Sequence, residues 1–264
     1  MEAKACVLAS GSSGNCIYIE AGNTKVLIDA GMSGCKIANS LMKLNVKPDE
    51  IDAVLVTHEH SDHVRGVGVI SRRYDLPVFA NEATWNCMKP QIGDIKLKNI
   101  KCFETNKWFE LKGLYFKPFS IPHDAAEPVG FCVYWKNRKI TVATDIGHMN
   151  KFVFNQIKKS DLLILEANHD VEMLKSGSYP WHLKRRIMGK NGHLSNEEAA
   201  KTLVNLVGLG NQQVLLAHLS AENNRPKLAY ETIKSALVTE GIHLERDVKI
   251  GLTFRNRPTA LYYI

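Results

Sequence analysis

The chain has 264 residues, 45% of them hydrophobic, so it can bury a substantial core, and we expect one domain spanning residues 1–264. No apolar run reaches membrane-spanning length, and the N-terminus turns polar at Ser10 before a signal-peptide core could form, which indicates a cytoplasmic protein without a membrane partner. The formal net charge of +7 favours a polyanionic partner such as nucleic acid, and the oligomeric state is left open.

Short strands and one helix are predicted in the first quarter of the chain. Residues 5–9, 16–20 and 25–29 are rich in Val, Ile, Leu and Tyr and are separated by Gly/Ser and Gly-Asn turns, which is typical of strands. Helical spacing of apolar residues follows at 33–44, and residues 53–56 form a further apolar run. The order is therefore strands, a helix, and a buried strand.

The rest of the chain alternates strands with amphipathic helices. Strands are predicted at residues 116–121, 130–135, 140–144, 162–165 and 214–217. Helices are predicted at residues 151–158, 196–206 and 226–240. This alternation indicates a layered α/β architecture in which helices cover sheets, with functional residues just after strand ends.

A dense group of metal-ligand side chains directly follows the strand at 53–56. The motif is His-x-His-x-Asp-His, beginning at His58. Side chains at i and i+2 of an extended segment point the same way, so His58 and His60 can bind one ion while Asp62 and His63 face a second. The alternative is a chance cluster of histidines on a polar loop, but such a group would repel or stay unpaired without an ion. Zn²⁺, Mn²⁺ or Fe suits these ligands.

This motif resembles that of the metallo-β-lactamase superfamily, and the rest of the family pattern follows in order. Asp29 ends an early strand, and the resemblance gives it a supporting role beside the ligands. His123, Asp145 and His218 each follow an apolar strand, although each taken singly could be an ordinary capping or hydrogen-bonded loop residue. The resemblance implies that one ion is bound by His58, His60 and His123, the other by Asp62, His63 and His218, with Asp145 as the bridge.

The same resemblance covers nearly the whole chain and carries an expected fold. It implies an α/β four-layer sandwich of the αβ/βα type, with two mixed β-sheets flanked by helices. It also implies two divalent metal ions, Zn²⁺ or Mn²⁺ in the first place and Fe as the further candidate.

Two later loops resemble those of tRNase Z-type phosphodiesterases. One contains Glu166 and the other contains His193, although the first departs from that family's His-Glu-Ala-Thr pattern at Leu165 and Asn168. By resemblance, Glu166 and His193 deliver a proton to the departing 3′ oxygen. They join Asp62 as the residues expected to act in catalysis.

A basic segment with aromatic residues lies between these loops. Basic side chains neutralise phosphates and aromatic rings stack on bases, whereas the alternative is a solvated basic helix with its aromatics packed inward. The side chains expected to contact substrate are Tyr179, Trp181, Lys184, Arg185 and Arg186. Ser195 begins the next helix in a capping box, and because the free amides of such a cap can also bind an anion, we include Ser195.

Residues 10–16, 179–187 and 192–196 together resemble the YycJ (WalJ) family of bacterial metallo-β-lactamase-fold proteins. That resemblance implies a 5′-to-3′ exonuclease that prefers DNA to RNA. The expected reaction is phosphodiester hydrolysis by a two-metal mechanism in which a bridging hydroxide attacks phosphorus.

Two other functions remain open at this point. A thioesterase of glyoxalase II type uses the same His/Asp motif, but Glu166, His193 and the basic segment disfavour it. A non-catalytic metal-binding regulatory module is the second alternative. The loss of a ligand would favour it, but every candidate ligand is present.

Six cysteines are scattered without the Cys-x-x-Cys spacing of zinc or redox motifs. They are Cys6, Cys16, Cys35, Cys87, Cys102 and Cys132. Because they lie mostly inside apolar stretches, we expect reduced core residues and not metal ligands.

Overall fold

The computed structural model describes residues 2–210 and 213–264, and these form two seven-stranded mixed β-sheets. The first sheet, in the order β14-β1-β2-β3-β4-β5-β6, contains β1 (Ala3–Ala9), β2 (Cys16–Ala21), β3 (Thr24–Ile28), β4 (Ala53–Leu55), β5 (Val78–Ala80), β6 (Ile100–Cys102) and β14 (Tyr262–Tyr263). The second, in the order β13-β12-β11-β10-β9-β8-β7, contains β7 (Phe109–Leu111), β8 (Leu114–Ser120), β9 (Val129–Trp135), β10 (Arg138–Ala143), β11 (Leu162–Glu166), β12 (Gln213–Ala217) and β13 (Lys249–Leu252).

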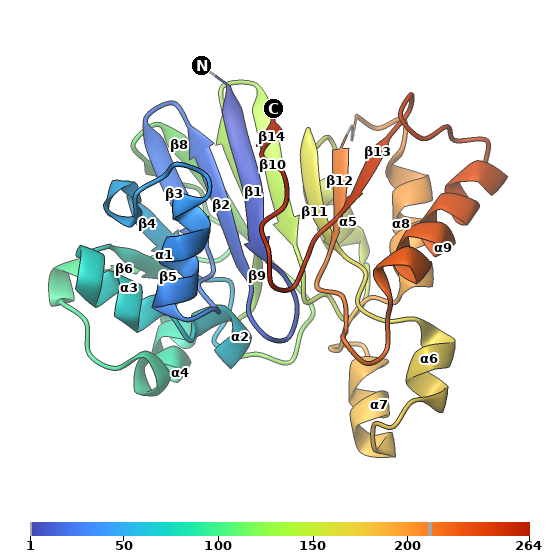
Figure 1. Cartoon of the computed structure of the whole chain (residues 1–264), viewed down its shortest axis with the longest axis horizontal. Helices are drawn as coiled ribbons and strands as arrows, with labels where there is room; N and C mark the ends of the chain where they lie inside the picture. The colour runs from blue at the N-terminus through green and yellow to red at the C-terminus, as the bar shows by residue number, and fades with distance from the viewer. Residues whose placement is uncertain (1, 211–212) are drawn as a thin grey trace.

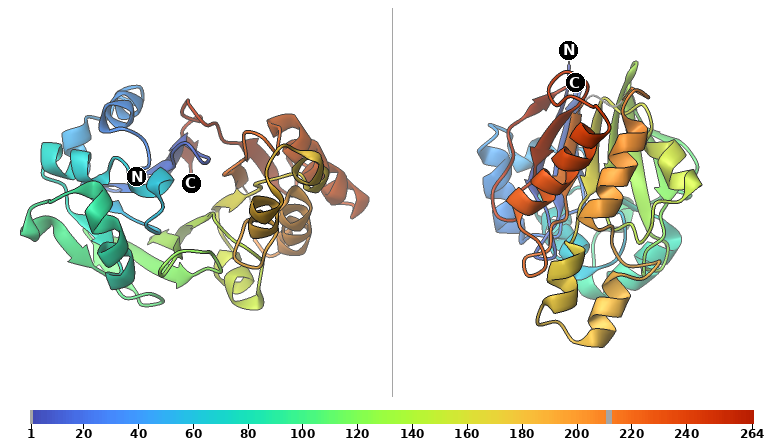
Figure 2. Two further views of the ribbon diagram at one scale, coloured as in Figure 1. Left: turned by 90° about the horizontal axis from the view of Figure 1, so that it is seen from below. Right: turned by 90° about the vertical axis from the view of Figure 1, so that its right-hand side faces the viewer.

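Helices cover the outer face of each sheet (Figure 1). Beside the first sheet lie α1 (Gly34–Met42), α2 (Ser61–Val64), α3 (Val67–Tyr74) and α4 (Glu82–Ile92). Beside the second lie α5 (Lys151–Ile157), α8 (Asn196–Leu206) and α9 (Pro226–Thr239). Two short helices, α6 (Val171–Ser176) and α7 (Trp181–Ile187), project together from one end of the molecule, as Figure 2 also shows.

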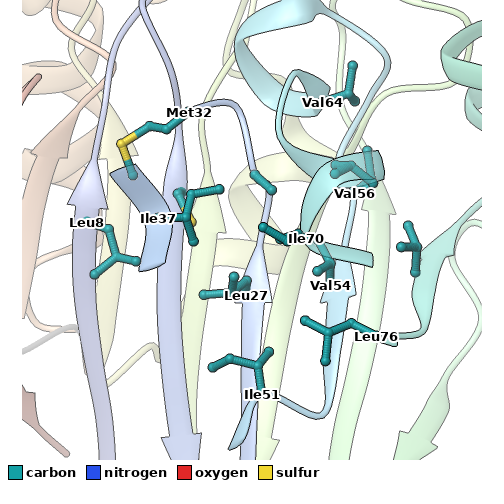
Figure 3. Close-up of a cluster of buried hydrophobic side chains, with 14 of the residues drawn as sticks. Leu8, Leu27, Met32, Ile37, Ile51, Val54, Val56, Val64, Ile70 and Leu76 are labelled. Carbon is teal, nitrogen blue, oxygen red and sulfur yellow. The ribbon is translucent and has the colours of Figure 1, made fainter. Parts of the chain in front are cut away.

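The two sheets form the inner layers and the helices the outer ones, because the strands bury side chains on both faces. In β1, Ala5 and Val7 enter the core between the sheets, while Cys6 and Leu8 enter the core under the helices. Successive side chains of a strand point to opposite faces, so the part of β1 that both cores cover is apolar on each face. Figure 3 shows the helix-side core, where strand residues such as Leu27 lie among residues of α1 and α3. The predicted four-layer α/β sandwich is confirmed.

The cysteine prediction is wrong for half of its residues. Cys6, Cys16 and Cys132 are buried, whereas Cys35, Cys87 and Cys102 are exposed, and all six are free thiols. Cys35 and Cys87 lie on solvent-facing sides of α1 and α4, and Cys102 lies on the edge strand β6, where one side of the strand is left uncovered. Separately, none of the helices in the described ranges has the length and apolar character needed to cross a bilayer.

Strand ends bring the predicted ligands to one end of the two sheets. Asp29 and His218 directly follow β3 and β12, and Asp145 lies two residues after β10. All three have left-handed backbone conformations, with φ of 60°, 56° and 60° respectively. Non-glycine residues adopt this region rarely, and such residues cluster at functional sites. These three sharp turns direct the side chains of Asp29, Asp145 and His218 into the candidate site.

Candidate active site

Three histidine nitrogens converge at the first predicted metal position. Nδ1 of His60 lies 3.1 Å from Nε2 of His58 and 3.3 Å from Nε2 of His123. Nδ1 of His123 donates to the carbonyl of Gly192 at 3.1 Å, and Nδ1 of His58 lies 2.9 Å from the Thr57 hydroxyl. Because a carbonyl can only accept, His123 carries its proton on Nδ1 and directs the lone pair of Nε2 at the cluster.

A second group contains Asp62, His63 and His218. Oδ2 of Asp62 lies 3.5 Å from Nε2 of His63 and 3.5 Å from Nε2 of His218. Behind the group, Asp29 accepts the Nδ1–H of His63 at 2.7 Å and the backbone N–H of Thr57 at 2.8 Å. This partner fixes the orientation of the His63 ring, as carboxylates do behind metal-binding histidines.

Asp145 faces both groups. Its Oδ2 lies 3.4 Å from Nε2 of His63, and its Oδ1 lies 3.4 Å from Nδ1 of His218 and 3.9 Å from Nε2 of His123. Oδ2 of Asp145 is buried and has no hydrogen-bond partner within the described residues. A buried carboxylate oxygen without a donor is costly, and a cation would remove that cost. The donor set therefore fits metal binding.

Two kinds of histidine meet in this cluster. Burial lowers the pKa of His58 well below its ordinary value, and neighbouring histidines lower it further, so His58 is neutral. Burial also acts to lower the pKa of His218, but Asp145, Asp62 and Glu166 outweigh it and raise that pKa to about 10. In the metal-free chain, protonated histidines such as His218 therefore balance the charge of the carboxylates, and metal binding must displace the proton from each ligand nitrogen.

Glu166, fully buried at the end of β11, joins the cluster to the neighbouring loop. Its Oε1 lies 2.8 Å from Nδ1 of His193 and 2.9 Å from Nδ1 of His218. Its Oε2 accepts the backbone N–H groups of Ile146 and Leu194 at 2.8 and 3.1 Å. Burial alone raises the pKa of a carboxyl, but the charges and hydrogen bonds of His193 and His218 lower the pKa of Glu166, which stays ionised.

Comparison with known proteins agrees with this geometry. Residues 24–219 match the β-lactamase superfamily domain. The chain is 40% identical over 261 residues to exodeoxyribonuclease YycJ of Bacillus anthracis, covering 98% of each chain. It is 38% identical over 260 residues to exodeoxyribonuclease WalJ of Streptococcus pneumoniae, covering 98% of this chain and 97% of the relative. The chain belongs to the YycJ (WalJ) family of the β-lactamase superfamily.

A solved structure of low sequence identity supports the same fold. YhfI from Bacillus subtilis, a metallo-β-lactamase fold protein, matches with a TM-score of 0.72 at 13% identity, covering 100% of both chains. Both the predicted family and the predicted fold are therefore confirmed.

A pocket of about 260 Å³ opens over the two ligand groups of this YycJ-family chain. Tyr179 and Arg186 from the basic segment line it, and Arg186 Nε donates to Asp124, the neighbour of His123. Trp181, which is 59% exposed, and Arg185, also exposed, do not line the pocket. The segment therefore presents Tyr179 and Arg186 to the site, and Trp181 and Arg185 to solvent.

Two residues of the expected substrate set have structural partners instead. Lys184 is only 8% exposed, and its Nζ donates to the carbonyls of Lys175 and Gly177 at 2.7 and 2.6 Å, which ties α7 to the end of α6. This burial corrects the expectation that Lys184 meets phosphate. Ser195 is buried in its predicted capping box with Glu198 and does not line the pocket.

Sequence reasoning missed Asn15 as a member of the site. Its Nδ2 lies 3.1 Å from Oδ2 of Asp62 and 3.0 Å from Nε2 of His63, and its backbone N–H donates to the Asp62 carbonyl at 2.7 Å. The chain packs so closely here that a Cβ at Gly31 would lie 1.6 Å from that carbonyl oxygen. The available signal was the position of Asn15 in the Ser/Gly stretch at residues 10–16.

Proposed function

We propose that this chain is a metal-dependent phosphodiesterase of the cytoplasm that degrades DNA from the 5′ end. The observation that carries the proposal is the convergence of two ligand groups on Asp145 next to the Glu166–His193 pair. The full-length similarity to two proteins named exodeoxyribonucleases favours DNA over RNA.

The proposed site holds two divalent ions, Zn²⁺ or Mn²⁺. One is bound by His58, His60 and His123, the other by Asp62, His63 and His218, and both by Asp145. Two such ions supply a nucleophile from water at neutral pH and neutralise the charge that develops on the phosphoryl oxygens. Asp29 acts behind them through its hydrogen bond to His63.

His193 is the proposed proton donor. Its Nδ1–H is held by Glu166, which leaves Nε2 to carry a proton to the departing 3′ oxygen. Burial lowers the pKa of His193, but the Glu166 carboxylate raises it above the ordinary value, which favours the protonated ring. An alkoxide leaves poorly unless it is protonated, and a positioned acid contributes roughly 10²- to 10⁴-fold in rate.

The walls of the pocket suit the end of a nucleic-acid strand. Its volume of about 260 Å³ is below the roughly 300–1,000 Å³ of drug-sized ligand sites, which favours one terminal nucleotide over a duplex. Tyr179 can stack on a base, and Arg186 can exchange Asp124 for a phosphate.

Labelled substrates test the function and its direction. Purified protein is incubated with Mn²⁺ or Zn²⁺ and DNA or RNA labelled at either end. We expect 5′-labelled DNA to release labelled mononucleotides from the first time point, and 3′-labelled DNA to shorten gradually. Immediate loss of a 3′ label would contradict the direction, and faster RNA degradation would contradict the preference. His60→Ala, which lacks a ligand, serves as the inactive control.

A further inference from the structure

A second cavity, of about 370 Å³, lies between the loop at residues 10–15, α1, and the segment after β13. The charged residues that line it are Lys36, Lys43, Arg65 and Arg255. Its polar lining consists of Ser13, Ser33, Asn39, Ser40 and Asn256. No acidic residue of the described chain lines this cationic cavity.

The cations of the cationic cavity are not neutralised by the protein. Within residues 2–210 and 213–264, Lys36, Lys43 and Arg65 have no ion-pair partner, and all three side chains lie in exposed residues. Arg255 donates only to a backbone carbonyl, that of Leu219, at 3.1 Å. Four like charges around one cavity repel one another, and an anion with several charges removes that repulsion.

The helix that forms one wall has two distinct faces. Lys36, Ser40 and Lys43 follow one another at i, i+4 and i+7 and share one face of α1. Ile37 and Leu41 lie on another face and are buried in the core that Figure 3 shows. Core packing therefore accounts for the apolar face of α1 and leaves the cationic face free for a ligand.

Three residues that line the cationic cavity lie next to segments that line the metal pocket or carry its candidate ligands. Ser13 lines the cavity while its neighbour Ser12 lines the metal pocket, and consecutive Cα atoms are about 3.8 Å apart. Arg65 follows His63 by two residues, and Arg255 bonds to the carbonyl of Leu219, the residue after His218. The loop at residues 10–15 therefore forms a wall of both sites.

We propose that the cationic cavity binds backbone phosphates of the DNA whose end occupies the metal pocket. This inference rests on the proposed function and adds to it a second contact region outside the catalytic pocket. DNA suits the cavity because each strand carries one negative charge per roughly 3.4 Å of helix axis, so a strand that leaves one site presents several charges to the next. A free phosphate ion shares this chemistry, and the test separates the two sources.

The test variant combines Lys36→Gln, Lys43→Gln and Arg65→Gln in the full-length, metal-loaded protein. The control combines Lys47→Gln, Lys136→Gln and Lys249→Gln, which also removes three charges. These three lysines precede or begin β4, β10 and β13, at the opposite end of the sheets from the ligands. We expect the test variant to raise KM for DNA roughly 10- to 100-fold and to flatten its salt dependence by about three units of slope. Its kcat and its cleavage of bis-p-nitrophenyl phosphate should match those of the control.

Each other outcome overturns a defined statement. If wild type cleaves DNA and the test variant has the control's KM and salt slope, the inference is wrong while the proposed function stands. If the test variant loses only its calorimetric binding of inorganic phosphate, the cavity is a small-anion site and the DNA assignment is wrong. If wild type cleaves bis-p-nitrophenyl phosphate but neither DNA nor RNA, the proposed function itself is wrong, and this inference with it.

Discussion

Oε1 of Glu166 accepts a hydrogen bond from Nδ1 of His218 at 2.9 Å, and the same oxygen accepts one from His193 at 2.8 Å. One carboxylate oxygen therefore orients a candidate ligand and the proposed proton donor together. Glu166→Gln keeps the shape but removes the charge that both rings contact. We expect metal affinity to fall about 10- to 100-fold, and DNA cleavage to fall further because His193 loses its raised pKa as well.

Chelator competition measures the metal affinity of Glu166→Gln, and kcat/KM on DNA measures its activity. Glu231→Gln, at an exposed position of α9, is the matched control. If Glu166→Gln lost activity while its metal affinity equalled that of the control, Glu166 would act on His193 alone.

His193→Ala should separate two substrates that differ in leaving group. In DNA the departing 3′ oxygen is an alkoxide that needs a proton, whereas p-nitrophenolate leaves without one. We expect DNA cleavage to fall roughly 10²- to 10⁴-fold while cleavage of bis-p-nitrophenyl phosphate changes little. His60→Ala should abolish both because it removes a ligand. An equal loss on both substrates would show that His193 positions phosphate and does not donate a proton.

Metal binding should release protons and weaken as the pH falls. The pKa of His218 is raised to about 10 and that of His63 lies well above its ordinary value, so both rings are protonated at neutral pH in the metal-free chain. A ligand histidine must be neutral, hence each ion displaces protons. Calorimetry at one pH in buffers of different ionisation enthalpy counts them, and elemental analysis should find two ions per chain. Release of no protons, or retention of one ion after loading, would contradict the site.

The basic segment should divide into a structural lysine and two binding arginines. Lys184→Met removes two hydrogen bonds from a buried ammonium to backbone carbonyls, so we expect a loss of about 1–3 kcal/mol in stability and an unchanged salt dependence of DNA binding. Arg185→Gln with Arg186→Gln should leave stability nearly constant and flatten that dependence by about two units of slope. Thermal melts measure the stability, and binding isotherms at several salt concentrations measure the salt dependence. If Lys184→Met flattened the salt dependence and the arginine variant lost stability, the two roles would be reversed.

Long periodic elements and strand-end ligands could be read from the sequence. The helix predicted at 196–206 is α8 to the residue, since its capping box and apolar spacing agree. By contrast, α2 and α3 were not anticipated, because Gly66, Gly68 and the paired Arg72 and Arg73 interrupt the apolar pattern of that region. The helix α4 was not anticipated either, because it contains Pro90, a residue that disfavours a helix interior. The three-residue strands β5, β6 and β7 are too short to show a period.

Within the site, residue type indicated which side chains are candidate metal ligands, but not which contacts orient them. In the sequence, Lys184 is one cation among several. Only the packing of α6 against α7 shows that its ammonium donates hydrogen bonds to backbone carbonyls. Asn15 lies far from the ligand motif along the chain, and its amide reaches Asp62 only after β1 and β2 are paired. Such contacts depend on tertiary structure, which local pattern does not encode.

The left-handed backbone at Asp29, Asp145 and His218 implies a trade-off between stability and activity. Each such conformation costs a non-glycine residue roughly 1–3 kcal/mol, and the cost is accepted where the ligand is needed. Glycine adopts these angles freely, but Asp145→Gly also removes the carboxylate that faces the protonated His63 and His218, so it should not melt above the metal-free wild type and should lose metal affinity. The metal-loaded wild type should melt above both, because a ligand that binds only the folded state raises its stability. Metal supply would then set how much folded protein persists, and a chain deprived of its ions would be the first to unfold.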